Sequence, residues 1–134
     1  MTVPPPRVLT YEVLGEPVPA QMGAMIRGRD GGWVNAKAGQ GRVRAYKDKV
    51  RVFTMLACQK ARWEASREAE FAVTLRAFVG TLRTIDCDNI AKAALDAIKG
   101  VAFPDDRQVV RLVVEKRLDR ERPRVEVEIE RLTS

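Results

Sequence analysis

The chain has 134 residues, of which 46% are hydrophobic and 31% charged, and its net charge is +6. This length fits one domain with a single core, and no apolar run approaches the roughly 20 residues of a membrane-spanning helix. The sequence has no histidine, which excludes His-dependent nucleophilic hydrolases, HNH-type nucleases and most zinc hydrolases. It also has no GxxxxGK[ST] loop, which argues against a P-loop ATPase. Carboxylates and lysines must therefore carry any chemistry.

The first half of the chain is predicted to hold a strand, a loop and a long helix. Residues 7–15 form the strand, and the Gly-rich residues 28–42 form a loop with room for a small hairpin. The helix begins near Arg42, and Trp63 packs in the core near its end. The apolar residues of this helix recur at spacings of three and four, which predicts one buried stripe: Val43, Tyr46, Val50, Phe53 and Ala57.

All of the excess positive charge falls between residues 27 and 51. This segment holds eight basic and two acidic residues, while the rest of the chain holds sixteen of each. Such a patch suits a polyanion, most economically nucleic acid; the alternative is a solvated surface that aids solubility. We expect seven of its basic residues to contact DNA: Arg27, Arg29, Lys37, Arg42, Arg44, Lys47 and Arg51.

The second half is predicted to hold strand, helix, strand and strand. Residues 69–79 alternate as a strand, and a helix over 88–99 ends at Gly100. Residues 107–117 are apolar on both faces, which predicts a central strand, whereas 124–130 alternate as an outer or half-exposed strand.

A hairpin loop is expected between these last two strands. The order of the elements predicts one compact α+β (α/β) domain over residues 1–134, in which a mixed sheet packs with two main helices. The N-terminal residues lack the basic and apolar regions of a secretory signal, and Cys58 and Cys87 fit no zinc or redox spacing. We therefore expect a cytoplasmic protein with two reduced thiols.

Two pairs of aspartates flank the second helix. Asp86 and Asp88 precede it, and Asp105 and Asp106 follow it. The helix is about 18 Å long, so a reversal after it would let the extended chain bring the second pair back to the level of the first. Lys92 would lie one turn beyond Asp88 on the polar face.

Converging carboxylates need a positive partner, and Mg²⁺ is the expected occupant. Beside a basic patch, such a site is typical of phosphodiester hydrolysis, where a lysine can stabilise charge on the phosphate. The structural alternative for Asp88 is that Asp88 or Asn89 caps the N-terminus of the second helix.

The stretch DCDNIAKAALDAIKGVAFPDDRQVV, residues 86–110, resembles the signature of the RusA family of Holliday junction resolvases. It contains D-x-D-N, a lysine four residues later, an LDAL-like helix end and DD-x-Q-V in that order. The resemblance implies a homodimeric endonuclease of bacterial or phage origin, dependent on Mg²⁺, which Mn²⁺ can replace. It implies paired symmetric nicks in four-way DNA junctions, in recombination and repair.

The same resemblance implies roles for four residues: Asp86, Asp88 and Asp106 as catalytic metal ligands, and Lys92 as the catalytic lysine. It assigns no clear role to Asp105. Three other classes stay open from the sequence: a metal-dependent nuclease for flaps, ends or other branched DNA, a DNA-binding protein that does not cleave, and a structural domain whose acids only cap helices.

Overall fold

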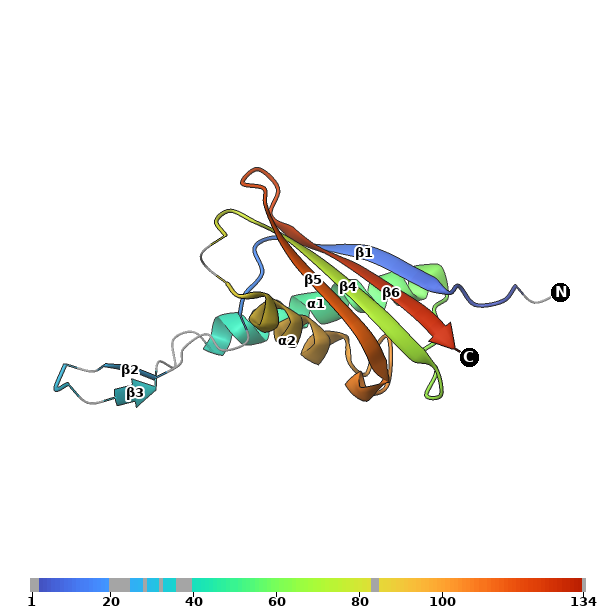
Figure 1. The fold of residues 1–134 in the computed structure, drawn as a ribbon, viewed down its shortest axis with the longest axis horizontal. Helices are drawn as coiled ribbons and strands as arrows, with labels where there is room; N and C mark the ends of the chain where they lie inside the picture. The colour runs from blue at the N-terminus through green and yellow to red at the C-terminus, as the bar shows by residue number, and fades with distance from the viewer. Residues whose placement is uncertain are drawn as a thin grey trace.

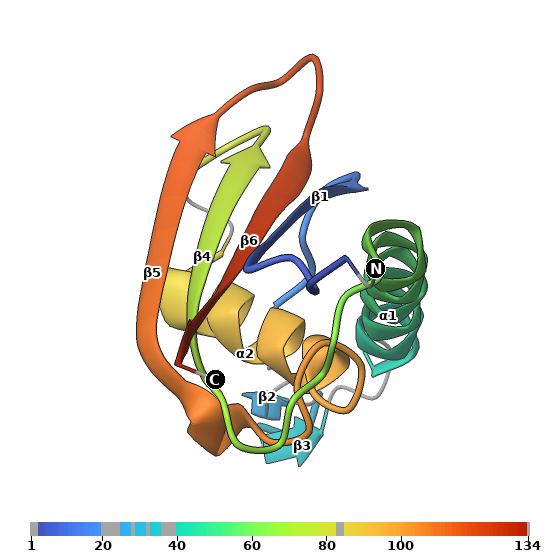
Figure 2. The same ribbon diagram turned by 90° about the vertical axis from the view of Figure 1, so that its right-hand side faces the viewer.

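The computed structural model describes residues 3–19, 25–27, 29–31, 33–35, 40–82 and 85–133. Four strands form a mixed sheet, and Figures 1 and 2 show two helices covering one face of it. This arrangement confirms the predicted α+β class. The elements are β1 (Val8–Leu14), a small hairpin of β2 (Met25–Arg27) and β3 (Trp33–Asn35), α1 (Gln40–Ala61), β4 (Glu70–Val79), α2 (Cys87–Ile98), the short 3-10 helix η2 (Asp106–Gln108), β5 (Val109–Leu118) and β6 (Arg124–Thr133).

The core lies between the sheet and the two helices. From β4, Phe71, Val73 and Leu75 are completely buried against the helices. The predicted stripe of α1 is confirmed, since Val43, Tyr46 and Val50 are buried and Phe53 and Ala57 pack against the same cluster. No helix in the described part of the chain is long and apolar enough to cross a membrane.

Two residues just after the helices have the roles that the sequence predicted. Gly100 has a φ of +84°, a left-handed conformation that favours glycine, and it ends α2 as expected. Trp63 follows α1, and its Nε1 donates to the carbonyl oxygen of Ala102 at 2.8 Å. Its ring lies 6.1 Å from that of Phe71, which confirms that Trp63 is a core residue.

The predicted positions of the last two strands are wrong. The sheet order is β1-β6-β4-β5, so β6 is central and β5 is an edge strand, parallel to β4. The helices cover only one face of the sheet, so a central strand can alternate buried and half-exposed residues, as Val125, Val127 and Ile129 do with the glutamates between them. The apolar residues on both faces of β5 do not reflect burial within one chain.

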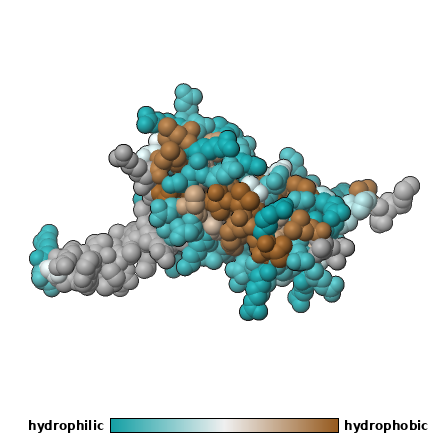
Figure 3. Space-filling view, in the orientation of Figure 1, coloured by the Kyte–Doolittle hydropathy of each residue, from teal (hydrophilic) through white to brown (hydrophobic). Residues whose placement is uncertain are grey.

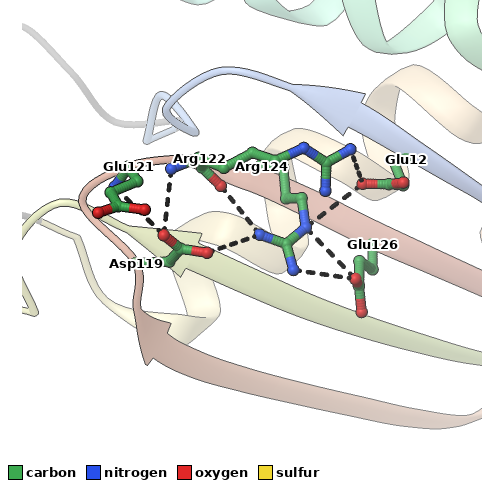
Figure 4. A network of polar contacts seen from close by, with 6 residues as sticks. All are labelled: Glu12, Asp119, Glu121, Arg122, Arg124 and Glu126. Atoms are coloured by element: carbon green, nitrogen blue, oxygen red, sulfur yellow. Dashed lines mark hydrogen bonds and ion pairs between the residues drawn. The ribbon is translucent and has the colours of Figure 1, made fainter.

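The connection between β5 and β6 is not the expected hairpin, because the two strands flank β4. It passes over the end of β4, where the backbone N–H of Asp119 donates to the Val79 carbonyl at 2.9 Å. Figure 4 shows the polar network that fixes this crossing around Arg124. The guanidinium of Arg124 is within 3.3 Å of carboxylate oxygens of Glu12 and Glu126 and 2.9 Å from Asp119.

Candidate active site

The first pair of aspartates lies at the start of α2. The helix begins at Cys87, and its N-cap is Asp86, not Asp88 or Asn89 as the capping alternative required. The Asp86 side chain makes no capping hydrogen bond, and both aspartates are exposed. Within the described residues, no hydrogen bond or ion pair occupies the side chain of Asp86, Asp88 or Lys92. Helix capping therefore does not account for these carboxylates.

A lysine from β5 fixes the segment that leads into this pair. The Nζ of Lys116 donates to the carbonyl oxygens of Leu82 at 2.8 Å and Ile85 at 2.9 Å. Ile85 is buried and immediately precedes Asp86. The sequence interpretation missed Lys116, although a signal was present: it continues the alternation of Leu112 and Val114, which places a charged residue on the apolar face of the strand.

The second pair of aspartates divides into two different environments. The Asp105 carboxylate accepts a hydrogen bond from the backbone N–H of Arg107 at 3.0 Å, while the Gln108 side chain accepts one from the Asp105 N–H at 3.1 Å. This reciprocal capping box begins η2. The hydrogen bond from Arg107 is the main cause that lowers the pKa of Asp105. Asp106 is exposed at the first position of η2. Asp105 thus has a structural role, whereas Asp106 presents its carboxylate to solvent.

Gln108 also fixes where this pair lies. Its Nε2 donates to the carbonyl oxygens of Ser66 at 2.8 Å and Ala69 at 2.9 Å, just before β4 begins. The second pair is therefore at the N-terminal end of β4 and β5. The first pair is at the opposite end, because Lys116, which holds Ile85, pairs with Ala77 near the end of β4.

The predicted return of the chain after Gly100 is therefore wrong. Eight residues of β-strand separate Ala69 from Ala77, about 26 Å of extended chain, and α2 spans this length between the two pairs (Figure 1). The reason is the burial of Phe103, which is completely enclosed and lies 5.5 Å from the ring of Phe71. This contact holds the chain at the end of α2 and prevents it from running back along the helix.

The carboxylates have the donor chemistry for a hard divalent cation, but one chain does not bring them together. Among the described residues, no three His, Cys, Asp or Glu side chains are placed to hold a metal ion. Each end of α2 offers one acidic pair. A site that uses Asp86, Asp88 and Asp106 together therefore needs a second chain.

Part of the predicted basic patch lies at the same end as Asp86. Arg42, Arg44 and Arg51 are exposed on α1. The Nζ of Lys49 donates to the Leu14 carbonyl at 2.6 Å, which places the first half of α1 at the end of β1. The backbone N–H of Gly80 donates to Glu16 at 2.7 Å, so β1 and β4 finish together.

The other predicted DNA contacts differ in their surroundings. Lys47 forms an ion pair of 3.1 Å with Asp96 and thereby links α1 to α2. Arg29 is exposed in the turn between β2 and β3. The side chain of Arg27 and all of Lys37 lie outside the described residues.

Comparison with known proteins identifies the family. A family model described as "Endodeoxyribonuclease RusA" matches residues 28–130, which include α1, both aspartate pairs and Lys92. No curated protein matches the chain. The family match extends over more than half of the chain and confirms the resemblance seen in residues 86–110. The chain therefore belongs to the RusA family of endodeoxyribonucleases, the enzymes that cut Holliday junctions.

Proposed function

We propose that this endodeoxyribonuclease cuts four-way junctions as a twofold dimer, with Mg²⁺ held by Asp86 and Asp88 of one chain and Asp106 of the other. The main support is the state of the first pair. Both carboxylates are exposed at the start of α2, neither is used in capping or ion pairing among the described residues, and the basic start of α1 lies at the same end of the molecule.

The exposed residues at the start of α2 suit metal-dependent hydrolysis of a phosphodiester. A bound divalent cation would lower the pKa of a water molecule and neutralise charge on the phosphate. Asp86 and Asp88 are aspartates, whose oxygen ligands Mg²⁺ prefers. Lys92 is exposed one turn further along α2, where its ammonium can stabilise charge on a phosphate or a leaving oxygen.

The dimer follows from both the site and the reaction. One chain separates Asp106 from Asp86 by the length of α2, so the third ligand must come from a partner. Two identical sites related by a twofold axis also match the approximate symmetry of a four-way junction. Paired nicks in opposing strands are then the natural product. We place this activity in the cytoplasm of a bacterium, on bacterial or phage DNA, with residues 1–134 acting as one domain.

The test of substrate and metal uses the wild-type protein. A synthetic four-way junction, a flap and a linear duplex of matched sequence are incubated with Mg²⁺, with Mn²⁺ and with EDTA. We expect paired symmetric nicks in the junction only when a metal ion is present. Preferential cutting of the flap would instead support a nuclease for other branched DNA. Binding without cutting in either metal would support a DNA-binding protein.

The test of the shared site mixes two inactive variants. Asp86→Asn and Asp106→Asn should each abolish cleavage but retain junction binding. If each site draws on both chains, a mixed dimer has one site with both substitutions and one site with neither. Equal mixing with free exchange of subunits should then restore nicking to about a quarter of the wild-type rate. A site within one chain would give no recovery, because every site would carry a substitution.

A further inference from the structure

Three charged side chains follow one another along the exposed face of α2. Asp88, Lys92 and Asp96 are spaced by four residues, about one helical turn, and all three are exposed. Side chains at this spacing are neighbours on a helix, and opposite charges there form ion pairs. Lys92 therefore stands between two carboxylates, each at the spacing that suits an ion pair with it.

Neither aspartate is paired with Lys92. Within the described residues, no hydrogen bond or ion pair occupies the side chain of Lys92 or Asp88, whereas Asp96 accepts a hydrogen bond from Lys47 of α1 at 3.1 Å. The side chains of Lys47 and Asp96 are 32% and 41% exposed. Ion pairs this exposed add little to the free energy of unfolding, so stability gives little reason for the contact.

The elements that pack beside α2 bring no other carboxylate to Lys92 among the described residues. The one acid of α1, Asp48, directly follows the lysine that faces α2 and so lies about 100° further around the helix. β5 also contacts α2, and Figure 3 shows apolar surface along the position of β5 in Figure 1. Its one acid, Glu115, is 2.9 Å from Arg117, and the alternation of the strand places it on the face without helices. Only the two aspartates of α2 are thus placed to neutralise Lys92.

We infer that Lys47 is a positioning residue for the nuclease reaction: by holding Asp96, it keeps the ammonium group of Lys92 unpaired and available to the phosphate. This inference rests on the catalytic role of Lys92 proposed above and adds two residues that act through it. Under that proposal Asp88 holds the metal ion, so each carboxylate beside Lys92 has another cation as its partner. The contact also explains why one residue of the basic patch points toward α2 and not into solvent.

An Asp96 without Lys47 would weaken catalysis in two ways. Its Cβ is about 5–6 Å from that of Lys92, as at any spacing of four residues on a helix, so its carboxylate would compete with the phosphate for the ammonium group. Its negative charge would also repel the phosphate directly. The ammonium group of Lys47, held 3.1 Å from Asp96, cancels both effects.

Single-turnover cleavage of a four-way junction tests this role, at a protein concentration that saturates binding so that the cutting step alone is measured. Lys47→Met should lower the rate about three- to tenfold, because Asp96 is released. The double variant Lys47→Met/Asp96→Asn should return to within about twofold of the wild-type rate, because the competing carboxylate is gone. If the contact only held α1 against α2, the second substitution would give no recovery, and Asp96→Asn alone would be as slow as Lys47→Met.

A second pair of variants separates this effect from net charge. Arg51→Met removes the same charge from the next turn of α1, where the described residues hold no ion pair with Arg51. Adding Asp96→Asn to Arg51→Met should change the saturated rate less than about twofold. An equal recovery in both backgrounds would assign the effect to overall charge and overturn the positioning role. Lys47→Arg should keep the wild-type rate, since a guanidinium also holds a carboxylate.

NMR of the lysine side chains reads the same contact without metal or DNA. The Cε and Hε resonances of Lys92, assigned with Lys92→Met, should shift in Lys47→Met as Asp96 turns to Lys92, and should return toward wild-type values in the double variant. Lys99 follows Asp96 by three residues and is the competing partner. A shift of the Lys99 resonances in place of those of Lys92 would overturn the inference.

The outcomes separate the positioning role from the proposed function. Cutting by Lys92→Met at the wild-type rate would overturn the catalytic role of Lys92, and this inference with it. An inactive Lys92→Met, together with a rate and Lys92 resonances that do not respond to Lys47→Met, would overturn the inference alone. An inactive Lys92→Met with slow cutting by Lys47→Met, recovery in the double variant and the expected shifts would support both.

Discussion

The Nζ of Lys116 donates to the carbonyl oxygen of Ile85 at 2.9 Å, so a residue of β5 sets the position of the residue immediately before Asp86. A second hydrogen bond, to the carbonyl oxygen of Leu82, fixes the segment between β4 and α2 at another point. Both bonds are charge-assisted. We therefore expect Lys116 to position the carboxylates at the start of α2.

Lys116→Met should slow junction cleavage about ten- to a hundredfold, because small displacements of catalytic groups are costly. Junction binding should stay within about twofold of wild type, while the Mg²⁺ concentration for half-maximal cleavage rises. Lys60→Met is the control, since it removes the same charge from the exposed last turn of α1. An unchanged Mg²⁺ requirement in Lys116→Met would argue against a positioning role.

Substitutions of Asp105 and Asp106 should have different effects. Asp106→Asn should abolish cleavage and leave the urea midpoint of unfolding unchanged, because Asp106 is exposed and makes no cap. Asp105→Ala should lower that midpoint, because it removes the acceptor of the capping box of η2, while retaining part of the activity. Unfolding curves and junction cleavage, measured on both variants, test this division of roles. The reverse pattern would exchange the two assignments.

The lowered pKa of Asp105 predicts how this contribution depends on pH. The hydrogen bond from the Arg107 N–H lowers the pKa in the folded state. Its stabilising effect is therefore fully present above the unfolded-state value of about 3.9 and is lost as the pH falls through the folded value. The difference in urea midpoint between wild type and Asp105→Asn should be larger at pH 7 than at pH 3. An equal difference at both pH values would contradict this account.

Salt dependence should distinguish the basic residues of α1. Arg42, Arg44 and Arg51 are exposed, so their combined replacement by alanine should lower the slope of log binding constant against log salt by about three, one for each lost phosphate contact. Lys47→Ala should change the slope less, because Lys47 is paired with Asp96.

The matched control for this triple variant also removes three positive charges. Lys60 in the last turn of α1 and Arg62 and Arg67 just after it, all exposed, are replaced by alanine. Filter binding of a four-way junction at several salt concentrations gives the slopes. Equal slopes for the two triple variants would show that the residues of α1 form a solvated surface and not a DNA contact.

The sequence predicted the elements that carry a strong local pattern. The stripe of α1, the alternation of β4 and the glycine that ends α2 were all correct, because each follows from periodicity or backbone conformation within a few residues. The family was also correct, because its motif lies in one continuous segment.

The errors concern contacts between distant segments. The burial of Phe103 against Phe71 decides where Asp105 and Asp106 lie, and no local pattern encodes that contact. The positions of β5 and β6 were reversed because apolar residues on both faces were interpreted as burial within one chain. In the structure these residues are exposed at an edge, which is the pattern that an interface between chains also requires.

The central position of β6 has a consequence for how the protein is made. Among the described strands β6 comes last in the chain, yet β1 pairs with it alone, from Val8 opposite Glu130 to Leu14 opposite Arg124. During synthesis β1 therefore has no strand of this sheet to pair with until β6 has emerged, so the four-stranded sheet closes late. A nascent chain stalled before residue 124 would keep β1 accessible to chaperones and proteases, and would have no nuclease fold with which to damage DNA.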